Sequence, residues 1–155
     1  MSFRISGLSA APYLALYGQS DQALGALGVR RYVADACPGY PDRIELRDVS
    51  PGECVLLVNY AHQPADTPYR ASHAIFVREG AADAYDRVDE VPDVLRVRPL
   101  SLRAFDAQHW MTDALLVPGD ELGAGVERLF ADPAVAYLQA HYATRGCYAA
   151  RITRV

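Results

Sequence analysis

The chain has 155 residues, of which 51% are hydrophobic and 22% charged, and its formal net charge is −4. This composition is typical of a single globular domain covering residues 1–155. The acidic balance argues against nucleic acid as a partner, because phosphate binding requires clustered basic residues. All fifteen basic residues are arginine, which excludes Schiff-base and Walker-type chemistry that depends on lysine.

The first half of the chain alternates short apolar runs with turn residues. Its expected elements are, in chain order, a strand at 3–5, helical material at 11–27 with Ser20 as N-cap, and strands at 29–33, 43–47, 54–60 and 74–78. The strands at 54–60 and 74–78 are the most apolar, so we expect them at the centre of a sheet.

The second half predicts more strands and two helices. Its expected elements are a strand at 95–105 that changes its apolar phase at Pro99, a strand at 111–117, a helix around 122–130, a helix from Pro133 to about Gly146, and a final strand at 147–155. Links between the middle strands are too short for parallel crossovers. We therefore predict an α+β fold with a mixed, largely antiparallel sheet and helices near the N- and C-terminal ends.

A polar loop at 62–73 separates the two most apolar strands and is the first candidate site. Two prolines stiffen it, and it holds His62, Arg70 and His73. Arginine presents a fork of donors to carboxylate or phosphate, so Arg70 is the expected clamp for an anion. The neighbouring hydroxyls that could contribute to ligand binding are those of Tyr60, Tyr69 and Ser72.

A second polar concentration lies in residues 141–148, where His141 and Cys147 are candidates for catalysis together with His73. In one interpretation Cys147 is a nucleophile with His141 or His73 as its base. In another the histidines bind a divalent metal, and in a third they form a pocket with Arg70 for an anion. Structural roles remain open beside these, with Cys147 buried as a small apolar residue and Arg70 paired with Asp66.

The spacing of histidines and cysteines predicts no tightly bound metal, because no two of them have fewer than five residues between them. No cofactor motif is present. The three cysteines are too few for a disulfide framework, and no apolar run reaches the ~20 residues that a membrane span needs. We therefore expect a cytoplasmic protein with no membrane contact.

Four blocks of the sequence together look familiar: FRISGL at the start, PGECVLLVNY, HQPADTPYRASHAIFVRE and the closing RGCYAARI. They resemble the bacterial domain-of-unknown-function family 1203, over essentially the whole chain. Relatives carry Pro-Cys-Arg where this chain has Pro41-Asp42-Arg43, and the resemblance implies no catalytic residue.

These observations favour a protein that binds or transforms an anionic small molecule in a pocket lined by histidine and arginine. One alternative is a non-catalytic interaction module that forms homo-oligomers, such as a homodimer, through the same loop. A second alternative is a histidine-based metalloenzyme.

Overall fold

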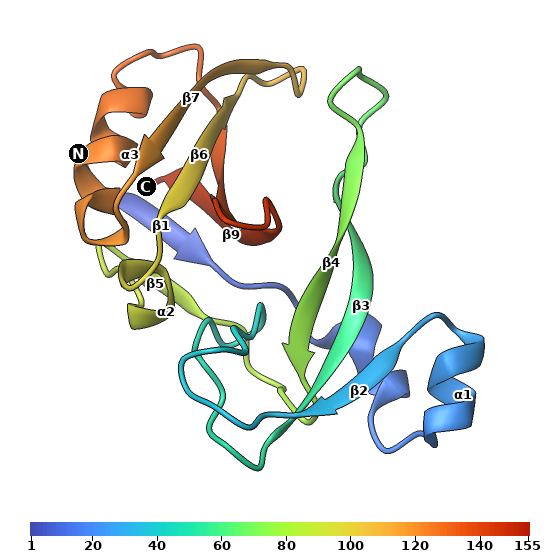
Figure 1. The fold of residues 1–155 in the computed structure, drawn as a ribbon. Coiled ribbons are helices and arrows are strands. Elements are labelled where there is room, and N and C mark those ends of the chain that lie inside the picture. The colour runs from blue at the N-terminus through green and yellow to red at the C-terminus, as the bar shows by residue number, and fades with distance from the viewer.

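The computed structural model describes residues 1–155 and contains two separate sheets (Figure 1). The larger sheet has six strands, in the spatial order β5 (Asp86–Val88), β1 (Phe3–Ser6), β9 (Tyr148–Arg154), β8 (Tyr137–Tyr142), β6 (Leu100–Phe105) and β7 (Met111–Val117). The smaller sheet has three strands, in the order β2 (Arg30–Val33), β3 (Cys54–Gln63) and β4 (Ala71–Arg78). Every strand pair is antiparallel. The predicted α+β class with largely antiparallel pairing is therefore confirmed, but the strands form two sheets and neither is mixed.

The helices are short and join the strands. They are two 3-10 helices, η1 (Ala11–Leu16) and η2 (Gly119–Glu121), and three α-helices, α1 (Asp21–Ala26), α2 (Asp93–Arg96) and α3 (Leu122–Phe130). Ser20 caps α1 as predicted, since its hydroxyl accepts a hydrogen bond from the Ala23 amide at 3.1 Å. None of these helices has the length and apolar character that a bilayer crossing requires.

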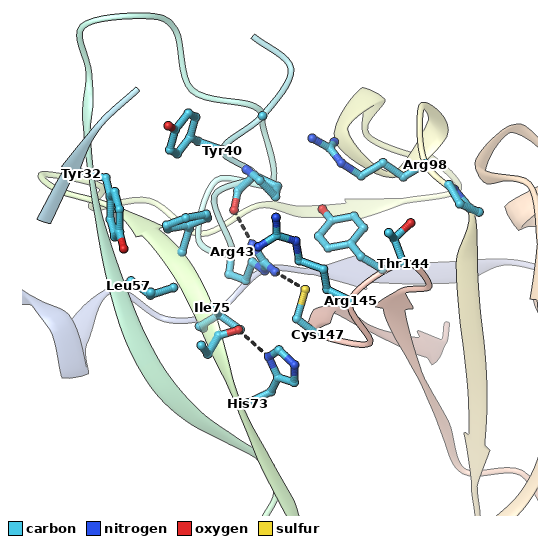
Figure 2. A pocket seen from close by; sticks show the side chains of 16 residues that line it. Tyr32, Tyr40, Arg43, Leu57, His73, Ile75, Arg98, Thr144, Arg145 and Cys147 are labelled. Carbon is cyan, nitrogen blue, oxygen red and sulfur yellow. Dashed lines mark hydrogen bonds between the residues drawn. The ribbon is translucent and has the colours of Figure 1, made fainter. Parts of the chain in front are cut away.

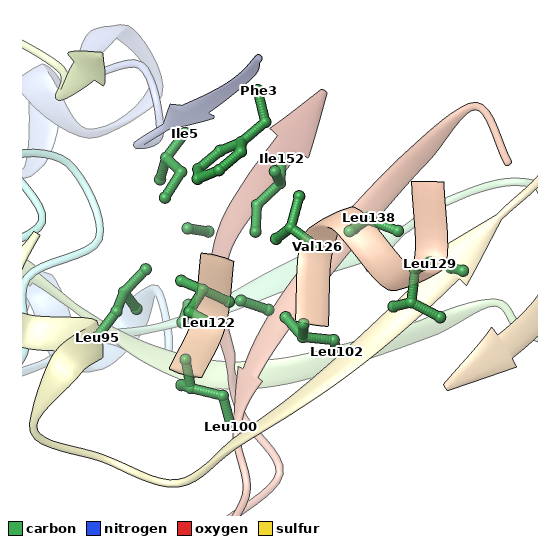
Figure 3. Packing of buried hydrophobic residues seen from close by; sticks show 14 of the residues in the cluster. Phe3, Ile5, Leu95, Leu100, Leu102, Leu122, Val126, Leu129, Leu138 and Ile152 are labelled. Atoms are coloured by element: carbon green, nitrogen blue, oxygen red, sulfur yellow. The ribbon is translucent and has the colours of Figure 1, made fainter. Parts of the chain in front are cut away.

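The larger of the two main hydrophobic clusters lies between α3 and one face of the six-stranded sheet (Figure 3). Three helix residues, Leu122, Val126 and Leu129, are buried there with strand residues such as Leu102. Gly125 lets the helix approach, because a Cβ atom at this position would lie 2.9 Å from Leu102 Cδ1 and 3.1 Å from Val117 Cγ1. The helix is therefore fixed against β6 and β7 by close packing.

The second hydrophobic cluster belongs to the β3–β4 hairpin, which stands beside the six-stranded sheet in Figure 1. Buried residues from both strands of the hairpin pack in this cluster with Tyr13 of η1 and Leu24 of α1. Two further members, Ile44 of the loop between β2 and β3 and Tyr148 of β9, join the hairpin to the larger sheet. The hairpin of the smaller sheet thus packs against β9 of the larger sheet, and this contact is the seam between the two sheets.

The predicted strand at 43–47 is wrong, because this segment forms a loop with a single isolated bridge between Pro41 and Asp48. The Asp42 carboxylate organises the loop by accepting hydrogen bonds from the backbone amides of Glu45 at 2.6 Å and Arg78 at 2.7 Å. Leu46 adopts a positive φ of 50°. The alternation of buried and polar residues is therefore produced by a folded-back loop rather than by a pleated strand.

The predicted helix at 133–146 is also wrong, because residues 137–142 form β8 between β6 and β9. Gly146 does mark a reversal of the chain, with φ 78° in the turn between β8 and β9. The predicted strand at 95–105 begins only at Leu100, since α2 occupies Asp93–Arg96. The last strand pairs with β1 and β8, and not with β3.

Candidate functional site

A pocket of about 570 Å³ opens between the β3–β4 hairpin and the turn between β8 and β9 (Figure 2). Its walls come from β2 and the β3–β4 hairpin, the loop before β3, the segment between α2 and β6, and the turn between β8 and β9 with its flanking residues. The lining residues are Tyr32, Gly39, Tyr40, Pro41, Arg43, Leu57, His73, Ala74, Ile75, Phe76, Arg98, Pro99, Tyr142, Thr144, Arg145 and Cys147.

Arg43 is the most unusual residue of this pocket, because its side chain is only 2% exposed and has no acidic partner. Its Nε donates to the Tyr148 carbonyl at 2.8 Å, and its Nη1 donates to the Pro41 carbonyl at 2.6 Å. Its Nη2 donates to the sulfur of Cys147 at 3.1 Å (Figure 2). All three acceptors are neutral in their ordinary forms, whereas buried charges are usually paired with an opposite charge.

The backbone of the 41–48 loop fixes Arg43 in this position. The Arg43 amide donates to the Phe76 carbonyl of β4 at 3.2 Å, and the Asp42 amide donates to the Arg47 carbonyl at 2.9 Å. Asp42 is itself fully buried but is not among the lining residues. Asp42 therefore shapes the loop, and the next residue, Arg43, faces the pocket.

Tyr142 lies between two guanidinium groups on the opposite wall. The Cζ atoms of Arg43 and Arg98 lie 4.9 Å and 5.2 Å from the centre of its ring, within the range of cation–π attraction. Its hydroxyl is buried and has no hydrogen-bond partner. Burial raises the pKa of Tyr142 to about 12, so the hydroxyl keeps its proton at neutral pH.

The charges that line the pocket are all positive, because three of its residues are arginines and none is acidic. Arg98 is balanced from outside the lining by Asp48, through hydrogen bonds of 2.8 Å and 2.6 Å to the two carboxylate oxygens. Arg145 is exposed at the β8–β9 turn, and no salt bridge involves it or Arg43. The pocket thus carries two unbalanced positive charges.

Two of the predicted catalytic residues, His73 and Cys147, line this pocket together. Cys147 is 8% exposed and follows the Gly146 turn directly before β9. His73 is half-buried on β4, where its Nδ1 lies 2.8 Å from the Ala74 carbonyl oxygen (Figure 2). The pairing of Arg43 with the sulfur was not predicted from the sequence.

The third predicted catalytic residue, His141, lies outside the pocket in a buried polar network. Its Nδ1 is 3.0 Å from the Gly146 carbonyl oxygen, and its Nε2 is 2.9 Å from Gln139 Oε1. Burial is the main cause that lowers the pKa of His141 to about 3, and the positive charge of Arg103 adds to it. His141 is therefore a neutral ring at physiological pH.

His62 belongs to the same network rather than to the pocket. Its ring packs edge-on against His141 with centres 4.8 Å apart, and its Nδ1 lies 3.2 Å from Gln139 Oε1. The Gln139 amide nitrogen in turn donates to the His62 carbonyl at 2.8 Å. Burial also lowers the pKa of His62. This network joins β3 to β8 across the seam between the two sheets.

The other predicted ligand-binding residues do not line the pocket. Arg70 and Ser72 are exposed at the tip of the hairpin. Tyr69 packs edge-on against Trp110 at 5.9 Å between ring centres, and Tyr60 packs against Tyr148 at 5.1 Å. The residues of the 62–73 loop therefore do not form one site. Arg70 and Ser72 are at the exposed tip, His62 belongs to the buried network, and only His73 lines the pocket.

Sequence reasoning did not select four pocket residues, namely Arg43, Arg98, Tyr142 and Arg145, although the last two lie in the polar segment 141–148. Arg43 and Arg98 fall in segments that alternate polar and apolar residues, and such polar residues are normally solvated. The chain contains no group of three or more His, Cys, Asp or Glu side chains that could hold a metal ion. The residues that could hold a ligand are thus cationic, aromatic and thiol groups.

No match to the chain was found among curated proteins or among solved structures. One family model does match, described as a protein of unknown function, DUF1203, and it covers residues 39–154. This range contains every residue that lines the pocket except Tyr32. The family inferred from the sequence is therefore confirmed over this range, which does not include the FRISGL block, and the chain belongs to the DUF1203 family.

Proposed function

We propose that the protein binds an anionic small molecule in the pocket between the hairpin and the β8–β9 turn. The observation that carries the proposal is the buried guanidinium of Arg43, which has no acidic partner. A buried charge is costly unless an opposite charge compensates it. An anion in the pocket would supply that compensation.

Arg145 and His73 complete the proposed binding surface. Arg145 is exposed at the rim, where its guanidinium can meet an incoming anion, and His73 faces the pocket from β4. Tyr32 and Tyr40 add aromatic walls. A cavity of about 570 Å³ lies in the size range of small-molecule sites, so we propose a metabolite-sized ligand that carries a carboxylate or a phosphate.

The test uses thermal unfolding in the presence of inorganic phosphate, acetate, succinate or citrate, followed by calorimetry for any anion that stabilises the protein. Sodium chloride keeps the ionic strength constant across the series. A ligand at about 100 times its Kd adds roughly 2.7 kcal/mol to the free energy of unfolding. We expect at least one of these anions to stabilise the wild-type protein in a saturable manner.

Two variants then locate the bound anion. We expect Arg145→Ala to weaken binding about tenfold, which corresponds to the loss of one charge-assisted hydrogen bond of roughly 1.5 kcal/mol. Arg70→Ala removes the same charge from the hairpin tip and should leave binding unchanged. Loss of binding in Arg70→Ala alone would move the site to the tip, as predicted from the sequence. The absence of saturable stabilisation by all four anions would also reject the pocket.

A further inference from the structure

We propose that Cys147 is a nucleophile that Arg43 activates, and that its target is an electrophilic carbon on the anionic small molecule bound in this pocket. The inference rests on the proposed function and adds a covalent step to it. It assigns the activating role to an arginine, whereas the sequence alone suggested a histidine base.

The first argument is the contact between Arg43 and the sulfur. Arg43 Nη2 donates to Cys147 Sγ at 3.1 Å, and the donor has no carboxylate to compete for its charge. The reactive form of cysteine is the thiolate, and a neighbouring cation favours that form in general. A Cys147 thiolate would also give the buried guanidinium its missing counter-charge.

The second argument is the placement of the histidines. His141 contacts Gln139 and Gly146, so neither of its ring nitrogens is directed at Cys147. His73 lines the pocket, and its Nδ1 donates to the Ala74 carbonyl, but no hydrogen bond joins its ring to Cys147, whose sulfur is contacted by Arg43. Arginine keeps its protons in proteins, so Arg43 stabilises negative charge on the sulfur without accepting the thiol proton. That proton is released to solvent before the attack.

The third argument is that the pocket stays electropositive while it holds a thiolate. Of its three arginines, Arg98 is neutralised by Asp48, and a Cys147 thiolate would neutralise Arg43. Arg145 then remains as one unbalanced positive charge at the rim. An anionic electrophile can therefore approach the thiolate without net repulsion, which a lining containing acids would not permit.

The fourth argument is the buried hydroxyl of Tyr142, which lines the same pocket and has no partner. Tyr142 is 5% exposed and keeps its proton, because burial raises its pKa to about 12. Buried polar groups are normally paired, so this hydroxyl is a donor at the wall of the pocket that the chain itself does not use. The pocket therefore combines the sulfur of Cys147 and its Arg43 contact, one unpaired cation at the rim and an unused donor.

The covalent step is a displacement at carbon. The lone pair of the Cys147 sulfur forms the S–C bond, and the bond from that carbon to the leaving group breaks. The leaving group departs with its electron pair, and the product is an S-linked adduct on Cys147. This step needs no oxidant or reductant.

Iodoacetate and iodoacetamide test the proposal, because they react by this displacement with loss of iodide and differ mainly in charge. Alkylation of each cysteine is followed by quenching and peptide mass spectrometry. Cys37 is exposed and serves as the reference within the same molecule. We expect iodoacetate to modify Cys147 at least tenfold faster than Cys37, although Cys147 is 8% exposed. We also expect the iodoacetate-to-iodoacetamide rate ratio to be several-fold higher at Cys147.

Arg145→Glu tests the electrostatic part without disturbing the buried contacts, since Arg145 is exposed. We expect this variant to lower the rate ratio at Cys147 to that at Cys37. Arg128→Glu makes the same charge change on the exposed face of α3 and should leave the ratio at Cys147 unchanged. Circular dichroism confirms that both variants are folded.

Two results would overturn the inference. Cys147 could react no faster than Cys37 with either reagent, or its rate ratio could be the same in Arg145→Glu and Arg128→Glu. If either occurs while an anion from the thermal-unfolding series still binds, the pocket remains a binding site and only the covalent step is rejected. If no anion of the series binds either, the proposed function is rejected as well.

Discussion

The substitution Tyr142→Phe tests whether the unpaired hydroxyl of Tyr142 lowers the stability of the folded protein. Tyr142 is 5% exposed, and its hydroxyl has no hydrogen-bond partner. Phenylalanine keeps the ring between the guanidinium groups of Arg43 and Arg98, at 4.9 Å and 5.2 Å. The substitution therefore removes the unpaired hydroxyl and preserves the cation–π contacts.

The expected magnitude follows from the cost of an unpaired buried hydroxyl, which is roughly 1–3 kcal/mol on scales derived from protein variants. The small void left by the missing oxygen offsets part of this gain. We expect the free energy of unfolding to rise by about 1 kcal/mol. For a chain of this size, that change corresponds to an increase in Tm of roughly 2–4 °C.

Tyr137→Phe is a matched control, because Tyr137 lies at the other end of β8 and is 4% exposed. Its hydroxyl accepts a hydrogen bond from Gln63 Nε2 at 2.8 Å and contacts His109 Nδ1 at 2.8 Å. We expect this variant to be destabilised by about 1–2 kcal/mol, since the buried Gln63 amide loses its partner. Chemical unfolding of both variants measures the difference. A Tyr142→Phe protein that is less stable than wild type would show that the hydroxyl is paired in solution, and it would refute the reasoning.

Two further predictions concern the framework of the fold. The pKa of His141 is lowered from 6.5 to about 3 in the folded protein. Between these pH values His141 binds a proton only in the unfolded chain. The contribution of the neutral His141 ring to folding stability is therefore present above pH 6.5 and is lost as the pH falls toward 3. Chemical unfolding at a series of pH values measures this effect. In the wild-type protein His141 should add up to about 1.4 kcal/mol per pH unit to the slope of the unfolding free energy against pH, and His141→Gln should remove that part of the slope. Equal slopes in the wild type and the variant would contradict this. Gly119→Ala would place a Cβ atom 2.0 Å from the Leu95 carbonyl oxygen, so we expect a loss of about 2 kcal/mol or more in thermal unfolding. Gly123→Ala, which meets nothing within 4 Å, should be neutral or slightly stabilising, and equal effects of the two substitutions would reject this account.

Much of the fold could be predicted from local patterns. The strand at 111–117 has the predicted bounds, and β3 and β4 lie where their apolar runs predict them. The helix predicted around 122–130 is α3. The apolar residues of these elements are the ones that are buried, because α3 buries one stripe of its surface and the hairpin strands bury mainly one face. The predicted central position is correct for β3 but wrong for β4, which is an edge strand of the three-stranded sheet.

The failure at 133–146 has a specific physical cause. All six residues of β8 are buried, since the strand lies in the middle of a sheet that is covered on both faces. A strand buried on both faces shows no alternation, and Val135, Leu138 and Tyr142 happen to fall at helical spacing. Asp132 and Pro133 imitate a helix start because the Asp132 carboxylate accepts the Ala134 amide at 2.9 Å in a turn. Residues 137–142 form a strand because they pair with β6 and β9, and this pairing is not visible in the local sequence.

The site was predicted less completely than the fold, because its parts are far apart in the chain. Arg43 and Cys147 are separated by 104 positions, and no local pattern connects them. The polar loop between two apolar strands did identify His73 as a candidate, and the polar segment 141–148 identified Cys147, which lies directly before β9. The same reasoning selected Arg70, whose exposed position depends on the length of the hairpin and could not be read from its neighbours.

The hydrogen bonds of Arg43 separate its structural role from its chemical one. Nε donates to the Tyr148 carbonyl and joins the 41–48 loop to β9, and Nη1 donates to the Pro41 carbonyl within that loop. Nη2 donates to a sulfur that can gain a negative charge. Lysine carries the charge on one nitrogen and cannot reproduce this planar fork. The geometry therefore requires arginine at this position, because one residue both closes the seam between the sheets and delivers a cation to Cys147.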